Sequence, residues 1–312
     1  MKLEDAARFL GERDDFEILT HEYPDGDTLG SAFALCLALQ RMGKRARVVT
    51  TALPKDFVFL LEGIKEQEFE AQTVVSVDIA DEKLLGKNRE AYEGRIELCL
   101  DHHASNRVSA PLRFVDPGAA SNCEIIFELF RLMDIKIDRT LANSLYTGVS
   151  TDTGCFKFGN TTSRTLRTAA VLLDCGAENA RINKVMFDTK TKLKIRLEQE
   201  IYGNIHYCAG DRCAMIAATL EMQRRLGIGD DELDGLASIP RQIEGVAIGI
   251  TLREKEENVF KISVRSDSRI INAAEFCAGF GGGGHIEAAG CQLEGTLDEV
   301  RETLRKAVES RL

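Results

Sequence analysis

The chain of 312 residues contains no tryptophan, five prolines and five histidines. It has no apolar run of the roughly 18 to 20 residues that a membrane-spanning helix needs, so we expect neither a membrane protein nor a membrane partner. The first residues, Met1–Ala6, are acidic and lack the apolar core of a signal peptide. We therefore expect a cytoplasmic protein.

The nine cysteines are odd in number and include no Cys-x-x-Cys pair. Cys36, Cys99 and Cys123 lie in apolar periodic stretches, where a free cysteine behaves as a small hydrophobic residue. We expect no disulfide framework in a chain of this size and compartment. Cys208 and Cys213 flank a predicted turn, and we interpret them as hairpin residues rather than metal ligands.

The chain also lacks an excess of positive charge. It has 40 Lys and Arg residues and 50 Asp and Glu residues, which gives a formal net charge of -10. A surface for long duplex DNA needs a broad basic face, so we exclude that partner. Short, small or single-stranded phosphorylated substrates stay compatible with this charge, since metal ions and a few arginines can hold them locally.

Short apolar strands alternate with helices over the first 150 residues. This alternation predicts an α/β fold in which helices flank a mostly parallel five-stranded sheet. The length of the chain predicts a second domain. The predicted strands are 16–20, 46–50, 73–77, 96–100 and 113–115, and the predicted helices are 29–42, 55–61, 121–132, 141–149 and 163–173.

The pattern changes after residue 205. Hairpins are predicted at 206–219 and 246–264, and helices at 271–280 and 296–311. The charged stretch 190–205 is interpreted as a connecting helix, with a surface helix of the first domain as the alternative. The expected division is a first domain of 1–188, a linker helix of 189–205 and a smaller α+β domain of 206–312.

Acids and imidazoles follow three of the predicted strands. His21 follows 16–20, Asp78 follows 73–77, and Asp101–His103 follow 96–100. Parallel α/β sheets bind ligands beyond the carboxyl ends of their strands, so we expect these side chains to meet at one edge. Asp101 is expected to orient an imidazole through a hydrogen bond, with a structural cap as the alternative.

Carboxylates combined with one imidazole per ion favour hard divalent cations such as Mn²⁺ or Mg²⁺ over a thiolate zinc site. Two ions roughly 3.5–4 Å apart would activate water and stabilise charge on phosphoryl oxygens. A turn-forming role is the alternative for Asp25 or Asp27 taken alone. The candidate metal ligands are His21, Asp25, Asp27, Asp78, His102 and Asp152.

Four consecutive glycines, Gly281–Gly284, end at His285. Glycine permits positive φ and close approach of backbone N–H groups to an anion, and a flexible tether is the alternative. Arg265 is a candidate for a bidentate phosphate contact or a plain surface charge. Phe156 and Phe158 alternate as in a strand, and we favour core packing over base stacking for them.

These motifs resemble a known family. Asp101–His103 together with His21-x-x-Pro24-Asp25-Gly26-Asp27, Asp78 and Thr151–Gly154 resembles the DHH phosphoesterase superfamily. Arg265-Ser266, the glycines with His285, and Ala288–Gly290 resemble its DHH-associated C-terminal domain. The length resembles the bacterial oligoribonuclease and pAp-phosphatase type. Ala104 departs from the expected proline, and the acid Asp267 departs from the expected small or basic residue.

The resemblance implies residue roles around two Mn²⁺ ions. His21, Asp25 and Asp78 would hold one ion. The second would be held by Asp27, Asp78, His102 and Asp152, so that Asp78 bridges both. Asp101, His102 and His103 would be the catalytic residues, with His103 contacting the substrate phosphate or assisting the leaving oxygen.

The resemblance also implies that substrate is held from the second domain. Arg265, Gly282, Gly283, Gly284 and His285 would bind its terminal phosphate, and chemistry would occur in a cleft between the domains. The expected activity is two-metal hydrolysis of short RNA to mononucleotides and of pAp to AMP. A phosphodiesterase for cyclic di-AMP, pApA or pGpG and a catalytically silent nucleotide-binding module are the alternatives. A homodimer is left open.

Overall fold

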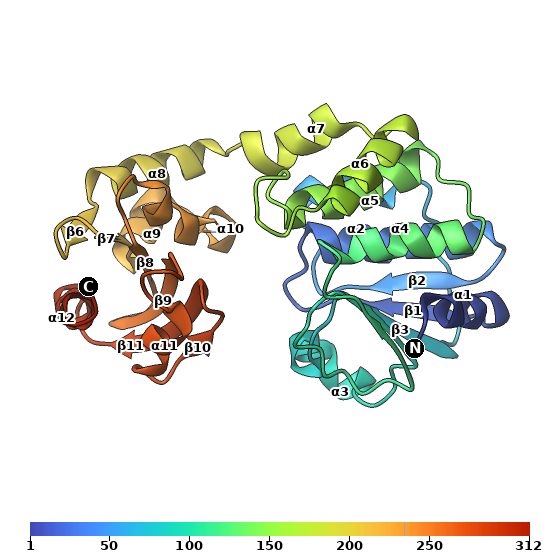
Figure 1. Cartoon of the computed structure of the whole chain (residues 1–312), viewed down its shortest axis with the longest axis horizontal. Coiled ribbons are helices and arrows are strands. Elements are labelled where there is room, and N and C mark those ends of the chain that lie inside the picture. Colours follow the sequence, from blue (N-terminus) through green and yellow to red (C-terminus); the bar gives the residue numbers. More distant parts are fainter. Residues whose placement is uncertain (234) are drawn as a thin grey trace. The chain divides into compact units, whose positions relative to one another are not determined.

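The computed structural model describes residues 1–233 and 235–312, and the chain divides into two units, Met1–Thr189 and Lys190–Leu312 (Figure 1). Within these described residues, no helix combines the length and the apolar character needed to cross a membrane. The helix predicted at 190–205 is α8 (Lys192–Gly203), and it belongs to the second unit.

The first unit is built on a parallel sheet with the strand order β2-β1-β3-β4-β5, which confirms the predicted fold class. The register sets Ile18 of β1 opposite Val48 of β2 on one side and Val75 of β3 on the other. The strands are β1 (Phe16–Leu19), β2 (Ala46–Val49), β3 (Thr73–Val77), β4 (Leu98–Asp101) and β5 (Leu112–Val115).

Side chains that alternate along these strands pack into two separate cores. Ile18 and Val75 contribute to the core shared with α1, α2, α4 and α5, whereas Leu19 and Val74 contribute to the core beside η2 and α3. Figure 1 shows α2 and α4 along one face of the sheet and α3 at the other. The helical elements are α1 (Leu3–Glu12), α2 (Gly26–Arg41), η1 (Lys55–Leu61), η2 (Glu82–Asn88), α3 (Arg89–Tyr92), α4 (Asn122–Leu132), α5 (Arg139–Asp152), α6 (Ser163–Asp174), α7 (Asn179–Asn183) and η3 (Lys184–Asp188).

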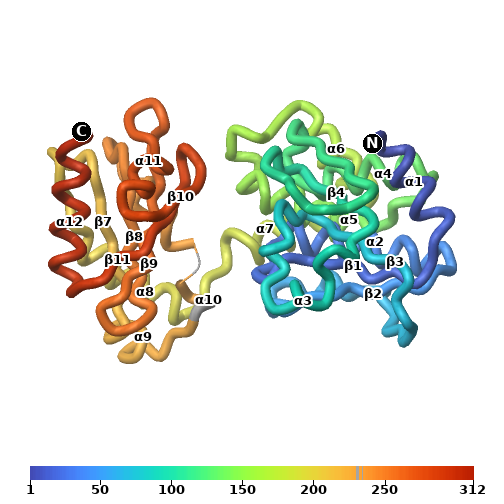
Figure 2. The backbone as a smooth tube through the Cα atoms, turned by 90° about the horizontal axis from the view of Figure 1, so that it is seen from below, coloured from blue at the N-terminus to red at the C-terminus, as the bar shows by residue number. Residues whose placement is uncertain are grey.

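The second unit contains a mixed sheet with the order β10-β11-β9-β8-β7-β6. The predicted hairpins are present as the antiparallel pairs β6–β7 and β8–β9, whereas β7 and β8 run parallel. Helices α11 and α12 cover one face of this sheet (Figure 2), and α8 and α9 contribute to a second core. Its further elements are β6 (His206–Cys208), β7 (Cys213–Ala218), α9 (Leu220–Leu226), α10 (Asp230–Leu233), η4 (Leu236–Ser238), η5 (Pro240–Gln242), β8 (Ile248–Glu256), β9 (Val259–Ser266), α11 (Ala273–Ala278), β10 (Gly283–Gly284), β11 (Ala288–Glu294) and α12 (Leu297–Glu309).

The prediction of a strand around Phe156 and Phe158 is wrong. Residues 153–159 form turns, in which Cys155 and Phe156 take positive φ values of 59° and 62°. Phe156 packs against the core of the first unit, while Phe158 is 58% exposed. Alternating aromatic residues are thus produced here by successive turns rather than by a pleated strand.

Candidate metal centre

The carboxyl ends of β1, β3 and β4 bring the predicted ligands together at one edge of the first sheet. Asp78 directly follows β3, and Asp101 ends β4 just before His102 and His103. Three groups have ligand atoms that all lie within 4.8 Å of one another. The groups are His21, Asp25 and Asp78; Asp27, His102 and Asp152; and Asp78, His102 and His103.

The start of α2 positions two of these carboxylates. Asp25 caps the helix by accepting hydrogen bonds from the N–H groups of Asp27 and Thr28, at 3.0 and 3.1 Å. Its Oδ2 also lies 3.9 Å from Nε2 of His21. In the structure, Asp25 therefore both caps helix α2 and lies beside His21.

Asp27 is held by a helix that begins almost a hundred residues later. The N–H groups of Asn122 and Cys123, at the start of α4, donate to its Oδ2 and Oδ1 at 2.5 and 2.8 Å. These first-turn N–H groups have no partner within the helix, so they stabilise the fully buried carboxylate. Sequence patterns around Asp27 carry no signal for this contact.

The end of α5 supplies Asp152 because α5 crosses α2 at very close range. A Cβ on Gly30 would lie 2.5 Å from the carbonyl oxygen of Ser144, and a Cβ on Gly148 would lie 2.5 Å from Oδ1 of Asp27. Glycine at both positions lets the two helices approach. As a result, Oδ2 of Asp152 lies 3.5 Å from Nε2 of His102.

We expect Gly148→Ala to destabilise the protein by about 1–3 kcal/mol and to weaken Mn²⁺ binding. The added methyl group would overlap Sγ of Cys123 and press on Asp27, so α5 has to shift. Thermal unfolding and Mn²⁺ titration measure the two effects. Gly11→Ala is the matched control, because nothing lies within 4 Å of its Cβ and alanine favours helix α1. Equal stability of the two variants would contradict the close crossing.

Asp78 lies at the centre of the cluster. Its Oδ2 accepts a hydrogen bond from Oγ1 of Thr28 at 2.5 Å, while Oδ1 is buried without a hydrogen-bond partner in the described part of the chain. Nε2 of His102 and Nδ1 of His103 lie 3.4 and 3.6 Å from that Oδ1. A buried carboxylate oxygen without a hydrogen-bond partner costs folding free energy. A bound divalent cation would offset that cost. The residues present therefore fit a hard cation.

Burial and mutual repulsion keep protons on this cluster. Burial, followed by the nearby charge of Asp78, raises the pKa of Asp27 to about 7. Burial also raises the pKa of Asp78 to about 6 and, together with the charge of Asp27, that of Asp152 to about 7. Burial alone would lower the pKa of His102, but the surrounding carboxylates raise it to about 10. A bound cation would replace these protons.

His102 is oriented by a backbone carbonyl. Its Nδ1 lies 3.3 Å from the carbonyl oxygen of Ala119. When Nδ1 donates to that oxygen, the lone pair of the neutral ring is on Nε2, the atom that faces Asp78 and Asp152. This is the tautomer that a metal ligand requires.

Asp101 orients His103, as predicted from its position. Oδ1 of Asp101 accepts from Nδ1 of His103 at 2.8 Å, and Oδ2 accepts from Nδ2 of Asn106 at 2.6 Å. The hydrogen bond with Asp101 raises the pKa of His103. Asn106, which also donates to the carbonyl oxygen of Ile79 at 2.9 Å, was not among the predicted site residues. Its closeness to Asp101 in the sequence is the only signal that could have indicated it.

The predicted substrate-binding residues of the second unit gather at the β10–β11 hairpin. Arg265 of β9 is opposite Ala288 of β11, and the N–H of Ala288 donates to the carbonyl oxygen of exposed His285 at 3.2 Å. Gly283 and Gly284 form β10 rather than an open loop. The N–H of Gly282 donates to the carbonyl oxygen of Cys277 at 2.9 Å, so that donor is used within the chain.

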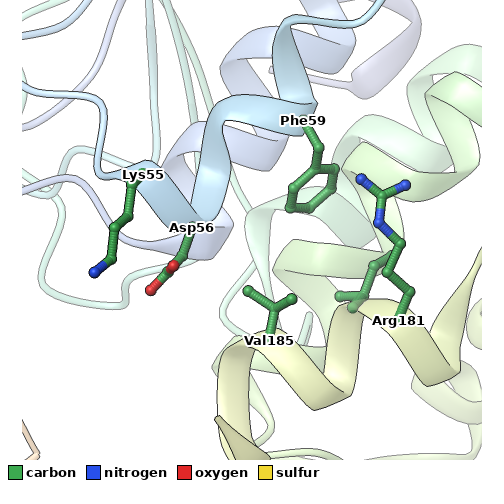
Figure 3. Close-up of a pocket in the computed structure, with 6 residues that line it drawn as sticks. Lys55, Asp56, Phe59, Arg181 and Val185 are labelled. Atoms are coloured by element: carbon green, nitrogen blue, oxygen red, sulfur yellow. The ribbon is translucent and has the colours of Figure 1, made fainter. Parts of the chain in front are cut away.

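A separate surface hollow of about 270 Å³ lies between η1 and α7 (Figure 3). In it, the guanidinium of Arg181 lies 5.3 Å from the ring centre of Phe59, near Val185. None of its lining residues is a predicted ligand, and an Arg–Phe contact of this kind is ordinary surface packing. We assign the chemistry to the carboxylate cluster instead.

Comparison with known proteins identifies the family. The DHH family, N-terminal domain, matches residues 16–149, and the DHHA1 domain matches residues 214–312. The bifunctional oligoribonuclease and PAP phosphatase NrnA of Thermus thermophilus is 32% identical over 306 residues, which cover 95% of this chain and 89% of that protein. The chain belongs to the DHH family. The resemblance inferred from Asp101–His103 is thereby confirmed.

Two further similarities of this DHH-family chain are to a longer phosphodiesterase and to a solved structure. The cyclic-di-AMP phosphodiesterase GdpP of Geobacillus thermodenitrificans is 26% identical over 329 residues, covering 96% of this chain but 48% of that protein. The chain thus spans about half the length of that relative. The crystal structure of an exopolyphosphatase-related protein from Bacteroides fragilis has a TM-score of 0.89 and 24% identity, covering 99% of this chain and 95% of the other. It shows the same fold.

Proposed function

We propose that this protein is a two-metal phosphoesterase that hydrolyses short RNA oligonucleotides to mononucleotides and removes the 3′-phosphate of pAp. The single observation that carries the proposal is the buried Oδ1 of Asp78, which lies between His102 and His103 and has no hydrogen-bond partner among the described residues. The similarity to the NrnA protein of Thermus thermophilus over nearly the full length of both chains supports the substrate class.

The proposed ligand sets follow the groups in the structure. His21, Asp25 and Asp78 would hold one divalent ion. Asp27, His102 and Asp152, with Asp78, would hold the other. When bound, such ions supply an activated water and neutralise charge on the phosphoryl oxygens. Oxygen donors with few imidazoles and no thiolate favour Mn²⁺ or Mg²⁺.

The chain's own residues would position the substrate. Asp101 holds Nδ1 of His103, so Nε2 is left for the substrate phosphate or the leaving oxygen. A raised pKa of His103 favours the proton that such a contact needs. Arg265 and His285 of the second unit would hold the terminal phosphate. Because all six predicted ligand positions carry groups able to bind a cation, we favour an enzyme over a silent nucleotide-binding module.

The alternative substrate is cyclic di-AMP or its linear product pApA. The similarity to GdpP favours it, although that protein is about twice the length matched here. The proposed ligands would serve either substrate, so relative rates distinguish the two.

The test is a rate comparison with Mn²⁺ on an RNA dinucleotide and trimer, pAp, pApA and cyclic di-AMP. We expect the short RNAs and pAp to be hydrolysed, and cyclic di-AMP to be the poorest substrate. Fastest turnover of cyclic di-AMP would favour the alternative. If none of these substrates is hydrolysed while nucleotides still bind, the protein is a silent binding module and the proposal fails.

A further inference from the structure

An exposed aromatic ring lies on the loop that follows the proposed ligand Asp152. The side chain of Phe158 is 58% exposed, although it stands between the buried Thr153 and the helix that begins at Ser163. A phenylalanine exposed to this degree contributes little apolar burial, so core packing does not account for the position of this ring.

The ring of Phe158 packs against the backbone of Gly154. Gly154 has a φ of +55°, and a Cβ there would lie 2.5 Å from Cε1 of Phe158. The ring therefore covers Gly154 closely while the rest of it faces solvent. The N–H of Phe158 donates to the carbonyl oxygen of Thr153 at 3.0 Å, and its own carbonyl oxygen accepts from the N–H of Thr161 at 3.1 Å. The ring is thus presented from a fixed turn.

The same loop is hydrogen-bonded to the backbone of the proposed ligand Asp152. Nδ2 of Asn160 donates to the carbonyl oxygens of Asp152 and Ala120, at 3.1 Å each. The neighbouring carbonyl of Ala119 contacts Nδ1 of His102 at 3.3 Å. The Asn160 side chain therefore links the turn that carries Phe158 to the backbone of Asp152 and to the segment that orients His102.

We propose that Phe158 is the stacking platform for one nucleobase of the substrate, and this inference rests on the proposed function. A half-exposed ring on a turn that is hydrogen-bonded to the backbone of the proposed ligand Asp152 suits an unpaired base, because every base has an apolar face and stacking tolerates any sequence. The consequence is selection for base-bearing nucleotides over inorganic polyphosphates, which offer no such face.

The kinetic test compares wild type and Phe158→Ala with Mn²⁺ on the RNA dinucleotide ApA and on its two analogues that each lack one base. We expect Phe158→Ala to raise KM for ApA roughly tenfold with kcat within about twofold, and Phe158→Trp to restore KM. The increase in KM should persist with one analogue and vanish with the other. The base that is missing from the analogue without the increase is the stacked base. Equal penalties with both analogues, or none with ApA, would overturn the proposal.

Leu132→Ala is the matched control, since Leu132 is 48% exposed at the far end of α4 from Asn122. We expect it to leave KM unchanged and both variants to keep the wild-type melting temperature.

A binding measurement separates this inference from the proposed function. The probe is a dinucleotide that contains 2-aminopurine and a non-cleavable methylene phosphonate linkage. We expect wild type to quench its fluorescence and Phe158→Ala to bind it roughly tenfold more weakly. If wild type hydrolyses nothing but this difference remains, the proposed function fails and the stacking role stands. If ApA is hydrolysed but the variant binds the probe equally, the stacking role alone fails. Absence of both hydrolysis and binding overturns both.

Discussion

Replacing Asp78 with asparagine is expected to reduce hydrolysis of an RNA dinucleotide by roughly 10³-fold or more. Even groups that only orient a metal ligand typically contribute about 10- to 100-fold to metal affinity or activity, and Asp78 belongs to two of the three ligand groups. Asparagine keeps the shape of the side chain but removes the charge that faces His102 and His103. Steady-state rates at several Mn²⁺ concentrations measure the loss, which added Mn²⁺ should not recover.

The same substitution is expected to preserve the fold. Asp78 sits near the buried carboxylate of Asp27, and like charges that share a buried site destabilise it. Removing one of them should leave the melting temperature without metal unchanged or higher. Asp134→Asn is the matched control, because Asp134 is exposed in a turn with a φ of 52°, which asparagine adopts readily. An Asp78→Asn variant that keeps a tenth of the wild-type rate would contradict the proposed centre.

Without divalent cations, the melting temperature is expected to fall as pH rises from 5 to 8. Asp27, Asp78 and Asp152 have folded-state pKa values raised to about 7, 6 and 7, above the unfolded value near 3.8. Each carboxyl group with a raised pKa therefore stabilises the folded state, fully so at pH values below its unfolded pKa. This stabilisation is lost as the pH rises through the folded-state pKa. His102, raised to about 10 from 6.5, loses its contribution at higher pH and in the same direction.

Mn²⁺ is expected to reverse this loss. A ligand at a hundred times its Kd stabilises a one-site protein by about 2.7 kcal/mol, which corresponds to roughly 5–10 °C for a unit of this size. The rise should be larger at pH 8 than at pH 5.5, because fewer protons then compete for the carboxylates. Calorimetry in buffers of different ionisation enthalpy should detect proton release.

The Asp78→Asn variant is the control for the metal-dependent rise, and it should show little of it. A rise in melting temperature that is equal at both pH values, or that persists in this variant, would place the bound Mn²⁺ elsewhere on the chain.

Several features of the centre were predictable because their signals are local. Short apolar strands that each end in an acid or an imidazole predicted both the parallel sheet and the shared edge for His21, Asp78 and His102. The role of Asp101 as a partner of an imidazole was also predictable, since His103 lies only two positions after it in the motif.

Long-range packing limited the other predictions. The glycine tract suggested a phosphate cradle, but a Cβ on Gly282 would lie 2.5 Å from Cβ of Cys291 on β11. Close strand packing therefore already requires glycine at that position. Phe156 and Phe158 looked equivalent in the sequence, yet successive turns pack Phe156 against the core and leave Phe158 exposed.

By itself, the amino-acid sequence determined the fold class, the family and the identity of the acids and imidazoles at the sheet edge, because periodicity and strand-end residues act within a few positions of each other. Only the tertiary structure decided how those groups are held. The α4 N–H groups that fix Asp27, and the glycine crossing that brings Asp152 to His102, join residues far apart in the chain. Such contacts depend on which surfaces pack together, and no local pattern encodes that choice.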